Sequence, residues 1–205
     1  MSATARAVTV RQGLWAEFLG LTYNVIEAGV GLAAGLAAGS VALIGFGLDS
    51  VVEASSSIVI IWRLSTERSG ASTSEDAERK AIRLVALAFY ALALYIVVNS
   101  TLELARGTHP EGSVPGIVLA VASLIVMPIL ARRKRQIAIE LSSGAMLADS
   151  KQTSLCTYLS AVLLIGLLAN SLFGWWWADP LAALGIAFFA AREGHELWHG
   201  EDLCC

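Results

Sequence analysis

Five polar side chains interrupt long apolar segments of the sequence at regular spacing. Asp49 and Glu53 are four residues apart. Gln152 and Cys156 repeat this spacing 103 residues later, and Asp149 lies three residues before Gln152. Residues three or four apart lie on one face of a helix, so each group presents its side chains together. Carboxylate, amide and thiolate groups all bind divalent cations, and the inclusion of sulfur favours Zn²⁺ over Mg²⁺ or Ca²⁺. These five residues are the candidate metal ligands.

The segments that carry these residues are too apolar for a soluble domain. Of the 205 residues, 56% are hydrophobic and 15% are charged, and the mean hydropathy is +0.67. Soluble domains have roughly 25% charged residues. A helix of about 20 apolar residues crosses a bilayer. Six segments qualify: 14–37, 41–63, 82–104, 114–131, 142–169 and 177–198. We therefore predict an all-α membrane protein with six transmembrane helices in a single transmembrane domain over 1–205, with no soluble domain.

The charge balance and the motif content exclude other classes of protein. The chain has 14 Lys and Arg residues against 17 Asp and Glu residues, which leaves no basic surface for nucleic acid. It contains no Ser/His/Asp set, no phosphate-binding loop and no His-Glu-x-x-His motif. An enzyme and a nucleic-acid partner are therefore not expected.

Lys and Arg residues gather on one side of the predicted helices. The opposite side has only Arg106, and Lys151 lies inside a span. Basic loops stay in the cytoplasm, so we predict cytoplasmic termini in a multi-pass protein of the plasma (inner) membrane. The residues on the predicted cytoplasmic side are Arg6, Arg11, Arg63, Arg68, Arg79, Lys80, Arg83, Arg132, Arg133, Lys134, Arg135 and Arg192.

A weak internal repeat relates the second and fifth predicted helices. These helices run in opposite directions, which predicts two inverted three-helix halves with a substrate site at the membrane midplane. Counting about 1.5 Å per residue places Glu53 and Cys156 at nearly the same depth. Ser40, Ala42, Asp49 and Glu53 recur at an offset of 103 residues as Ser143, Ala145, Gln152 and Cys156.

Simpler roles remain open for each candidate ligand. A charged residue at the centre of a membrane helix costs about 2.5–3.5 kcal/mol and normally faces the bundle interior. Asp49 and Glu53 could be a buried pair satisfied by Lys151 or by hydroxyl groups. Cys156 could be a small packing residue, and Gln152 could form a hydrogen bond between helices.

Two further groups of residues are candidates for binding the ion along its route. Asn24 and Glu27 share a face of the first span and are candidates to line an ion path. His195 and His199 are four residues apart near the end of the chain, close to Cys204 and Cys205. They could capture metal on the cytoplasmic side, or this segment could be the polar end of an interfacial helix.

Three stretches of the sequence resemble the cation diffusion facilitator (cation efflux) family. Residues 39–53, Gly-Ser-Val-Ala-Leu-Ile-Gly-Phe-Gly-Leu-Asp-Ser-Val-Val-Glu, look like its second transmembrane helix, where Ser-x-Ala-Leu leads to a His or Asp and then to an Asp four residues later. Residues 143–156 are similar to its fifth helix, and Ala178, Asp179 and Pro180 resemble the opening of its sixth.

This resemblance implies a transporter that exports Zn²⁺, or a related ion such as Co²⁺, Cd²⁺, Mn²⁺ or Fe²⁺, from the cytoplasm in exchange for protons. It also implies a homodimer in the lipid bilayer, no resident cofactor and one four-ligand site. Asp49 and Glu53 fall on the ligands of the second helix. Gln152 and Cys156 fall where the family has His and Asp, and Asp149 matches the Ala-Asp that precedes them.

The sequence departs from the family pattern in two places. The fifth helix offers Gln152 and Cys156 in place of His and Asp, and we expect no counterpart of the family's C-terminal cytoplasmic domain. The alternative function is a membrane cation-binding sensor or interaction protein without transport.

Overall fold

The computed structural model describes residues 3–68, 75–107 and 109–199, and it consists of six long helices. Each of the six predicted spans coincides with one helix, apart from residues 142, 143 and 177 at the starts of two spans, and the described residues contain no strand. Five of the helices, α1 to α5, are long and apolar enough to cross a membrane, while α6, with 22 residues, is the shortest and is not among them. The prediction of an all-α membrane protein is confirmed. The helices are α1 (Ala3–Ala38), α2 (Val41–Arg68), α3 (Glu75–Arg106), α4 (Val114–Leu141), α5 (Gly144–Phe173) and α6 (Ala178–His199).

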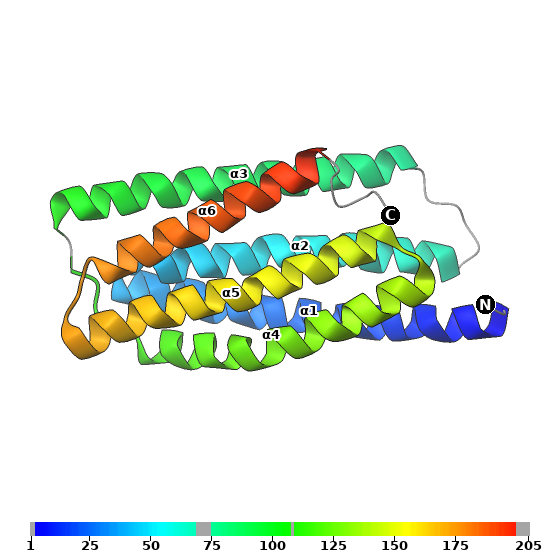
Figure 1. Ribbon diagram of the computed structural model, residues 1–205, viewed down its shortest axis with the longest axis horizontal. Helices are drawn as coiled ribbons and strands as arrows, with labels where there is room; N and C mark the ends of the chain where they lie inside the picture. The colour runs from blue at the N-terminus through cyan, green and yellow to red at the C-terminus, as the bar shows by residue number, and fades with distance from the viewer. Residues whose placement is uncertain (1–2, 69–74, 108, 200–205) are drawn as a thin grey trace.

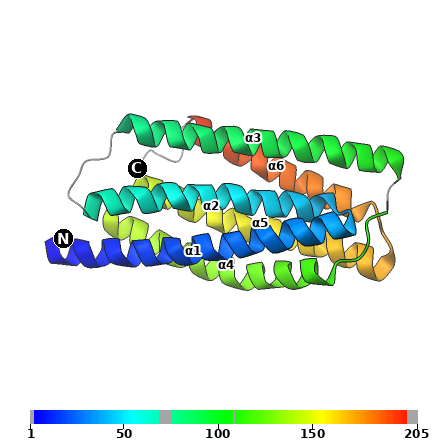
Figure 2. The same cartoon turned by 180° about the vertical axis from the view of Figure 1, so that it is seen from behind.

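The helices form three pairs that lie side by side along the long axis (Figures 1 and 2). The pair α1 and α4 lies on one side, α3 and α6 lie on the other, and α2 and α5 lie between them. Helix α4 runs opposite to α1, and α5 runs opposite to α2. The two helices that carry the predicted ligands are therefore the central pair of the bundle.

Packing in the first half of the chain is repeated in the second half. Helix α1 packs on α2 as α4 packs on α5, and α2 contacts α3 as α5 contacts α6. Equivalent residues also make equivalent hydrogen bonds. The Ser40 hydroxyl accepts from the Leu43 N–H at 3.0 Å, and the Ser143 hydroxyl accepts from the Met146 N–H at 3.4 Å. These N-caps fix the starts of α2 and α5 at the offset of 103 residues found in the sequence.

Glycine residues bring α1 and α2 into close contact. A methyl group on Gly35 would lie 2.8 Å from the backbone nitrogen of Ile44, and one on Gly47 would lie 2.9 Å from that of Leu32. Small residues at such positions allow membrane helices to approach closely. The close approach continues toward the bundle centre, where the side chain of Glu27 in α1 meets Ser50 in α2.

The start of α6 is bonded to the start of α2. The Ser40 hydroxyl donates to Asp179 Oδ1 at 2.5 Å, and the Ala42 N–H donates to Asp179 Oδ2 at 3.2 Å. A carboxylate is favourable at a helix N-terminus because the free N–H groups there carry partial positive charge. The Asp-Pro opening of α6 thus holds the N-terminus of the helix that carries Asp49 and Glu53.

Helix α4 is longer than the sequence analysis predicted, and this changes the interpretation of the basic run at its end. The span was expected to end at residue 131, but the helix continues to Leu141. Arg132, Arg133 and Arg135 are exposed, whereas Lys134 is completely buried. The sequence analysis expected residues 132–135 to form a loop after that span, and this was wrong because they are helical. Lys134 falls on the buried stripe of the helix, which consists of Met127, Ala131, Lys134, Ala138 and Leu141.

Candidate metal-binding site

Three acidic or thiol side chains are buried at the centre of the bundle, one on each of three helices. Glu27 of α1 is 0% exposed, and Glu53 of α2 and Cys156 of α5 are each 1% exposed. Cys156 also belongs to the main apolar cluster of the protein. These three residues are called the central cluster below. The structure therefore brings together one ligand predicted on α2, one predicted on α5 and one residue predicted for the ion path.

Glu27 is the most highly connected member of the central cluster. Its Oε2 accepts a hydrogen bond from the Ser50 hydroxyl at 2.9 Å and lies 3.9 Å from Cys156 Sγ. Its Oε1 accepts a hydrogen bond from the hydroxyl of Ser123 in α4, which is also 2.9 Å from the Tyr23 hydroxyl. One carboxylate thus joins four helices.

The Glu53 carboxylate is buried, and neither oxygen has a partner at ordinary hydrogen-bond distance and angle among the residues that the structure describes. Lys134 acts on this carboxylate electrostatically, and the Thr153 hydroxyl and the Cys156 thiol are close enough to donate weak hydrogen bonds to it. Among the described residues, the buried Asn24 on α1 likewise has no hydrogen-bond partner for either atom of its side-chain amide. A buried polar group without a partner is costly unless something else binds it. Binding of a cation or a proton would therefore stabilise the buried Glu53 carboxylate, as expected of a transport ligand.

Asp49 and Gln152 face a different part of the interior. Both line a small cavity between α2, α3, α5 and α6, together with Glu193 of α6. Glu193 was missed in the sequence analysis, although it continues the buried stripe of α6 through Ala187 and Ala190. Four of the five predicted ligands are thus divided between the central cluster and a second group, which consists of Asp49, Gln152 and Glu193.

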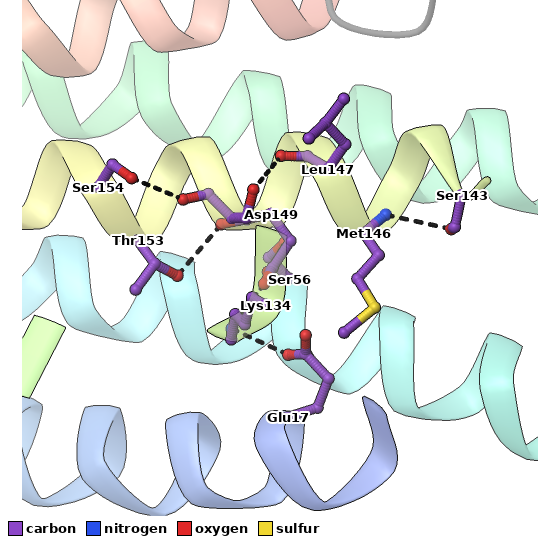
Figure 3. A network of polar contacts seen from close by, with 10 residues as sticks. Glu17, Ser56, Lys134, Ser143, Met146, Leu147, Asp149, Thr153 and Ser154 are labelled. Atoms are coloured by element: carbon purple, nitrogen blue, oxygen red, sulfur yellow. Dashed lines mark hydrogen bonds and ion pairs between the residues drawn. The ribbon is translucent and has the colours of Figure 1, made fainter. Parts of the chain in front are cut away.

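Asp149 is bonded to other residues. Its Oδ2 is 2.5 Å from Lys134 Nζ, and its Oδ1 accepts a hydrogen bond from Ser56 at 2.9 Å (Figure 3). Lys134 Nζ also lies 3.0 Å from Glu17 Oε2. Glu17, Lys134 and Asp149 are called the ion-paired cluster below. Lys151, which the sequence analysis considered as the neutralising cation, is exposed on the outside of α5.

The donors are close, but they do not form a finished metal site. In residues 3–68, 75–107 and 109–199, no three His, Cys, Asp or Glu side chains are arranged to hold a metal ion. The donor types nevertheless fit a borderline-soft divalent cation, because the central cluster offers two carboxylates and a thiol. Binding would require these side chains to turn toward a common point.

The two histidines near the end of α6 lie together on the surface. Their ring centroids are 4.1 Å apart, His199 Nδ1 is 2.9 Å from the His195 carbonyl oxygen, and the Tyr90 hydroxyl is 3.5 Å from His195 Nδ1. The structure thus pairs the two rings but places them outside both buried clusters. Cys204 and Cys205 lie outside the described residues.

Comparison with known proteins identifies the family. The sequence model of the cation efflux transmembrane domain matches residues 18–198. The chain belongs to the cation efflux family. Members of this family are transporters and not enzymes. The match includes every residue of the central cluster, and Glu17 of the ion-paired cluster lies one residue before it.

Three relatives are longer than this chain. It is 28% identical over 180 residues to an uncharacterized transporter of Synechocystis sp., covering 85% of this chain and 56% of the relative. It is 28% identical over 87 residues to the cation-efflux pump FieF of Shewanella oneidensis, covering 42% and 29%. It is 23% identical over 188 residues to the magnetosome protein MamB of Magnetospira sp., covering 89% and 62%. The matched region therefore spans less than two thirds of each relative.

Proposed function

We propose that this chain exports a divalent metal cation, most readily Zn²⁺, from the cytoplasm across the membrane in exchange for protons. Membership of the cation efflux family and the printed name of the Shewanella relative, a cation-efflux pump, support export of a cation. The observation that carries the proposal is the Glu53 carboxylate, which is buried beside Cys156 with neither oxygen in a well-formed hydrogen bond to a described residue.

The proposed ligands are Glu27, Glu53 and Cys156. A thiolate with two carboxylates favours Zn²⁺, and it also accepts Co²⁺ or Cd²⁺ more readily than Mg²⁺ or Ca²⁺. Metal binding requires the thiol and the carboxyl groups to lose their protons. Protons and metal therefore compete for the same atoms, and this competition is the physical basis for exchange.

The second group, Asp49, Gln152 and Glu193, would bind the ion before or after it occupies the central cluster. Asp49 lies one turn from Glu53 along α2, and Gln152 lies one turn from Cys156 along α5. An ion that leaves the central cluster can therefore meet Asp49, Gln152 and Glu193 in the adjoining cavity.

The orientation and the assembly are part of the same proposal. The exposed side chains Arg6, Arg11, Arg132, Arg133 and Arg135 lie toward the end of the bundle at which α1 and α5 begin, and we assign this end to the cytoplasm. We further propose that the protein acts as a homodimer in the plasma (inner) membrane.

The test is Zn²⁺ uptake into proteoliposomes with an outward-directed proton gradient, with proton efflux recorded in the same vesicles. We expect Zn²⁺ entry coupled to proton exit in the wild type and its loss in Glu53→Gln and Cys156→Ser. Glu111→Gln is the matched control, because the Glu111 side chain is exposed on the connection between α3 and α4. Zn²⁺ flux without proton movement would contradict the exchange. Zn²⁺ binding without any flux would instead favour the sensor or interaction protein.

A further inference from the structure

Lys134 is a buried cation inside a membrane bundle, and the proposed transport mechanism does not yet use it. It is flanked in the sequence by three exposed arginines, but its own side chain is 0% exposed. Its ammonium lies 2.5 Å from Asp149 Oδ2 on α5 and 3.0 Å from Glu17 Oε2 on α1 (Figure 3). The ion-paired cluster therefore joins α1, α4 and α5 through a single ammonium group.

The position of this cluster relative to the central cluster can be followed along two helices. On α5, Asp149 lies seven residues before Cys156, which is two turns away on the same face. On α1, Glu17 lies ten residues before Glu27. In both helices the displacement is toward the end of the bundle at which α1 and α5 begin. The ion-paired cluster thus lies between that end and the central cluster.

Helix α1 is shaped to admit the lysine side chain. A methyl group on Gly20 would lie 3.2 Å from Lys134 Nζ and 3.3 Å from its Cε. Because such a contact is tighter than ordinary packing, even an alanine at position 20 would press on the ammonium. The absence of a side chain at Gly20 leaves the space through which Lys134 reaches Glu17 and Asp149.

Stability alone gives little reason for such an arrangement. Burying an ion pair removes its charges from solvent, and replacing such a pair with neutral groups is often neutral or stabilising. A lysine between two carboxylates has another effect, because its ammonium occupies the position that a passing cation would take and repels a cation that approaches. Lys134 also acts electrostatically on Glu53 of the central cluster.

We propose that Lys134 is a tethered cation that closes the route between the cytoplasmic end of the bundle and the central cluster. The route opens when Lys134 separates from Glu17 or Asp149. A divalent ion bound at Glu53 repels the same ammonium, so closure by Lys134 and occupation of the central cluster oppose each other. The name of the end that is closed rests on the proposed function, but the closure itself does not.

The closure can be tested without metal and without transport, through the reactivity of Cys156. The protein carries Cys204→Ser and Cys205→Ser so that Cys156 is its remaining thiol. It is reconstituted in vesicles of known orientation, and a membrane-impermeant thiol reagent is added to each face in turn. The variants are Lys134→Met, Lys134→Arg, and the triple variant Glu17→Gln with Lys134→Met and Asp149→Asn. Arg132→Met is the matched control, because Arg132 is an exposed basic residue of the same helix.

We expect Lys134→Met and the triple variant to raise the rate of Cys156 labelling by about tenfold or more from the face at which α1 begins, because loss of the closing interaction increases the open population. Labelling from the other face should change little, Arg132→Met should behave as the wild type, and Lys134→Arg, which keeps the positive charge, should be labelled more slowly than Lys134→Met. The triple variant leaves no charge unpaired, so it decides the question if Lys134→Met fails to fold. An unchanged labelling rate in the folded triple variant would overturn the proposal, whether or not the wild type transports Zn²⁺.

Discussion

The thiol of Cys156 lies 3.9 Å from the carboxylate of Glu27, although 129 residues separate them in the chain. This contact joins α5 of the second half to α1 of the first. It places a thiol and a carboxylate from the two halves beside one another at the centre of the bundle. Glu27 is therefore a neighbour of the predicted ligands and more than a residue that lines the approach to them.

The first prediction concerns the thiolate as a metal ligand. Cd²⁺ or Co²⁺ bound to a thiolate gives a ligand-to-metal charge-transfer band, so the Cys204→Ser and Cys205→Ser background should show this band on titration. Cys156→Ser should abolish this band, because the thiolate is lost. It should also weaken Cd²⁺ binding about tenfold or more, which corresponds to about 1.4 kcal/mol or more of binding free energy. Absorption spectroscopy and equilibrium dialysis make the two measurements. A band of full intensity in Cys156→Ser would remove Cys156 from the ligand set.

The second prediction concerns the charge of Glu27. Glu27→Gln keeps an oxygen that can accept from Ser50 or Ser123 but removes the negative charge. We expect Cd²⁺ affinity to fall about tenfold while the thermal unfolding midpoint changes little, because a hydrogen bond between neutral groups contributes only about 1 kcal/mol. Ser55→Ala, a change on the exposed face of α2, is the control. Unchanged Cd²⁺ affinity in Glu27→Gln would restrict Glu27 to a structural role.

The third prediction concerns the close packing of α1 and α2. Gly35→Ala places a methyl group 2.8 Å from the backbone nitrogen of Ile44, so the two helices must separate. We expect a destabilisation of about 1–3 kcal/mol, as for other overpacked sites. Gly29→Ala is the matched control, because a methyl group there meets nothing within 4 Å. It should leave stability unchanged or raise it, since alanine is the better helix former. Equal effects of the two substitutions on thermal unfolding would contradict this packing argument.

The fourth prediction concerns the bond between α6 and α2. Asp179→Asn removes the charge that the Ser40 hydroxyl and the Ala42 N–H bind, and it should lower stability by about 1.5–3 kcal/mol. Ser40→Ala should lower stability as well, and the double variant should be less destabilised than the sum of the single variants, because both changes remove the same hydrogen bond. Unfolding of all four proteins in one detergent tests this. Strictly additive effects would show that Ser40 and Asp179 act independently.

The fifth prediction separates the second group from the central cluster. Glu193→Gln changes the cavity that Asp49 and Gln152 line but leaves the groups around Cys156 in place. We expect Zn²⁺ flux to fall while the Cd²⁺–thiolate band is retained. Glu196→Gln, one turn of α6 further along, is the control and should leave both unchanged. Loss of the band in Glu193→Gln would mean that the two groups form one site.

The six helices could be predicted from the sequence because each is a long apolar segment, and length and hydropathy determine which segments span a bilayer. The shared depth of Glu53 and Cys156 in the membrane could also be predicted from the sequence, since it follows from counting residues along two antiparallel helices. In the structure the two side chains are neighbours, as equal depth on adjacent helices requires. Metal binding by Glu53 and Cys156 belongs to the proposed function.

Other features of the site depend on how the helices are rotated and how closely they pack. Asp49 and Glu53 share one helix face, yet they contact different groups because other helices meet that face along its length. Glu27 reaches Cys156 only because glycines let α1 approach α2. The sequence analysis placed Lys134 with its arginine neighbours on the cytoplasmic side of the membrane. Only its position on the stripe through Ala131 and Ala138 distinguishes it, and this stripe is visible once the helix is known to continue to Leu141.

The bond from Asp179 to the start of α2 has a consequence for how the protein can move. Because the Asp179 carboxylate at the start of α6 binds the start of α2, these two helices are held together at the end opposite the ion-paired cluster. A tilt of α2 relative to α6 therefore turns about that joint, and the displacement of α2 grows with distance from it. Glu53 lies farther from the joint than Asp49 does, so the same tilt would carry Glu53 through the longer arc.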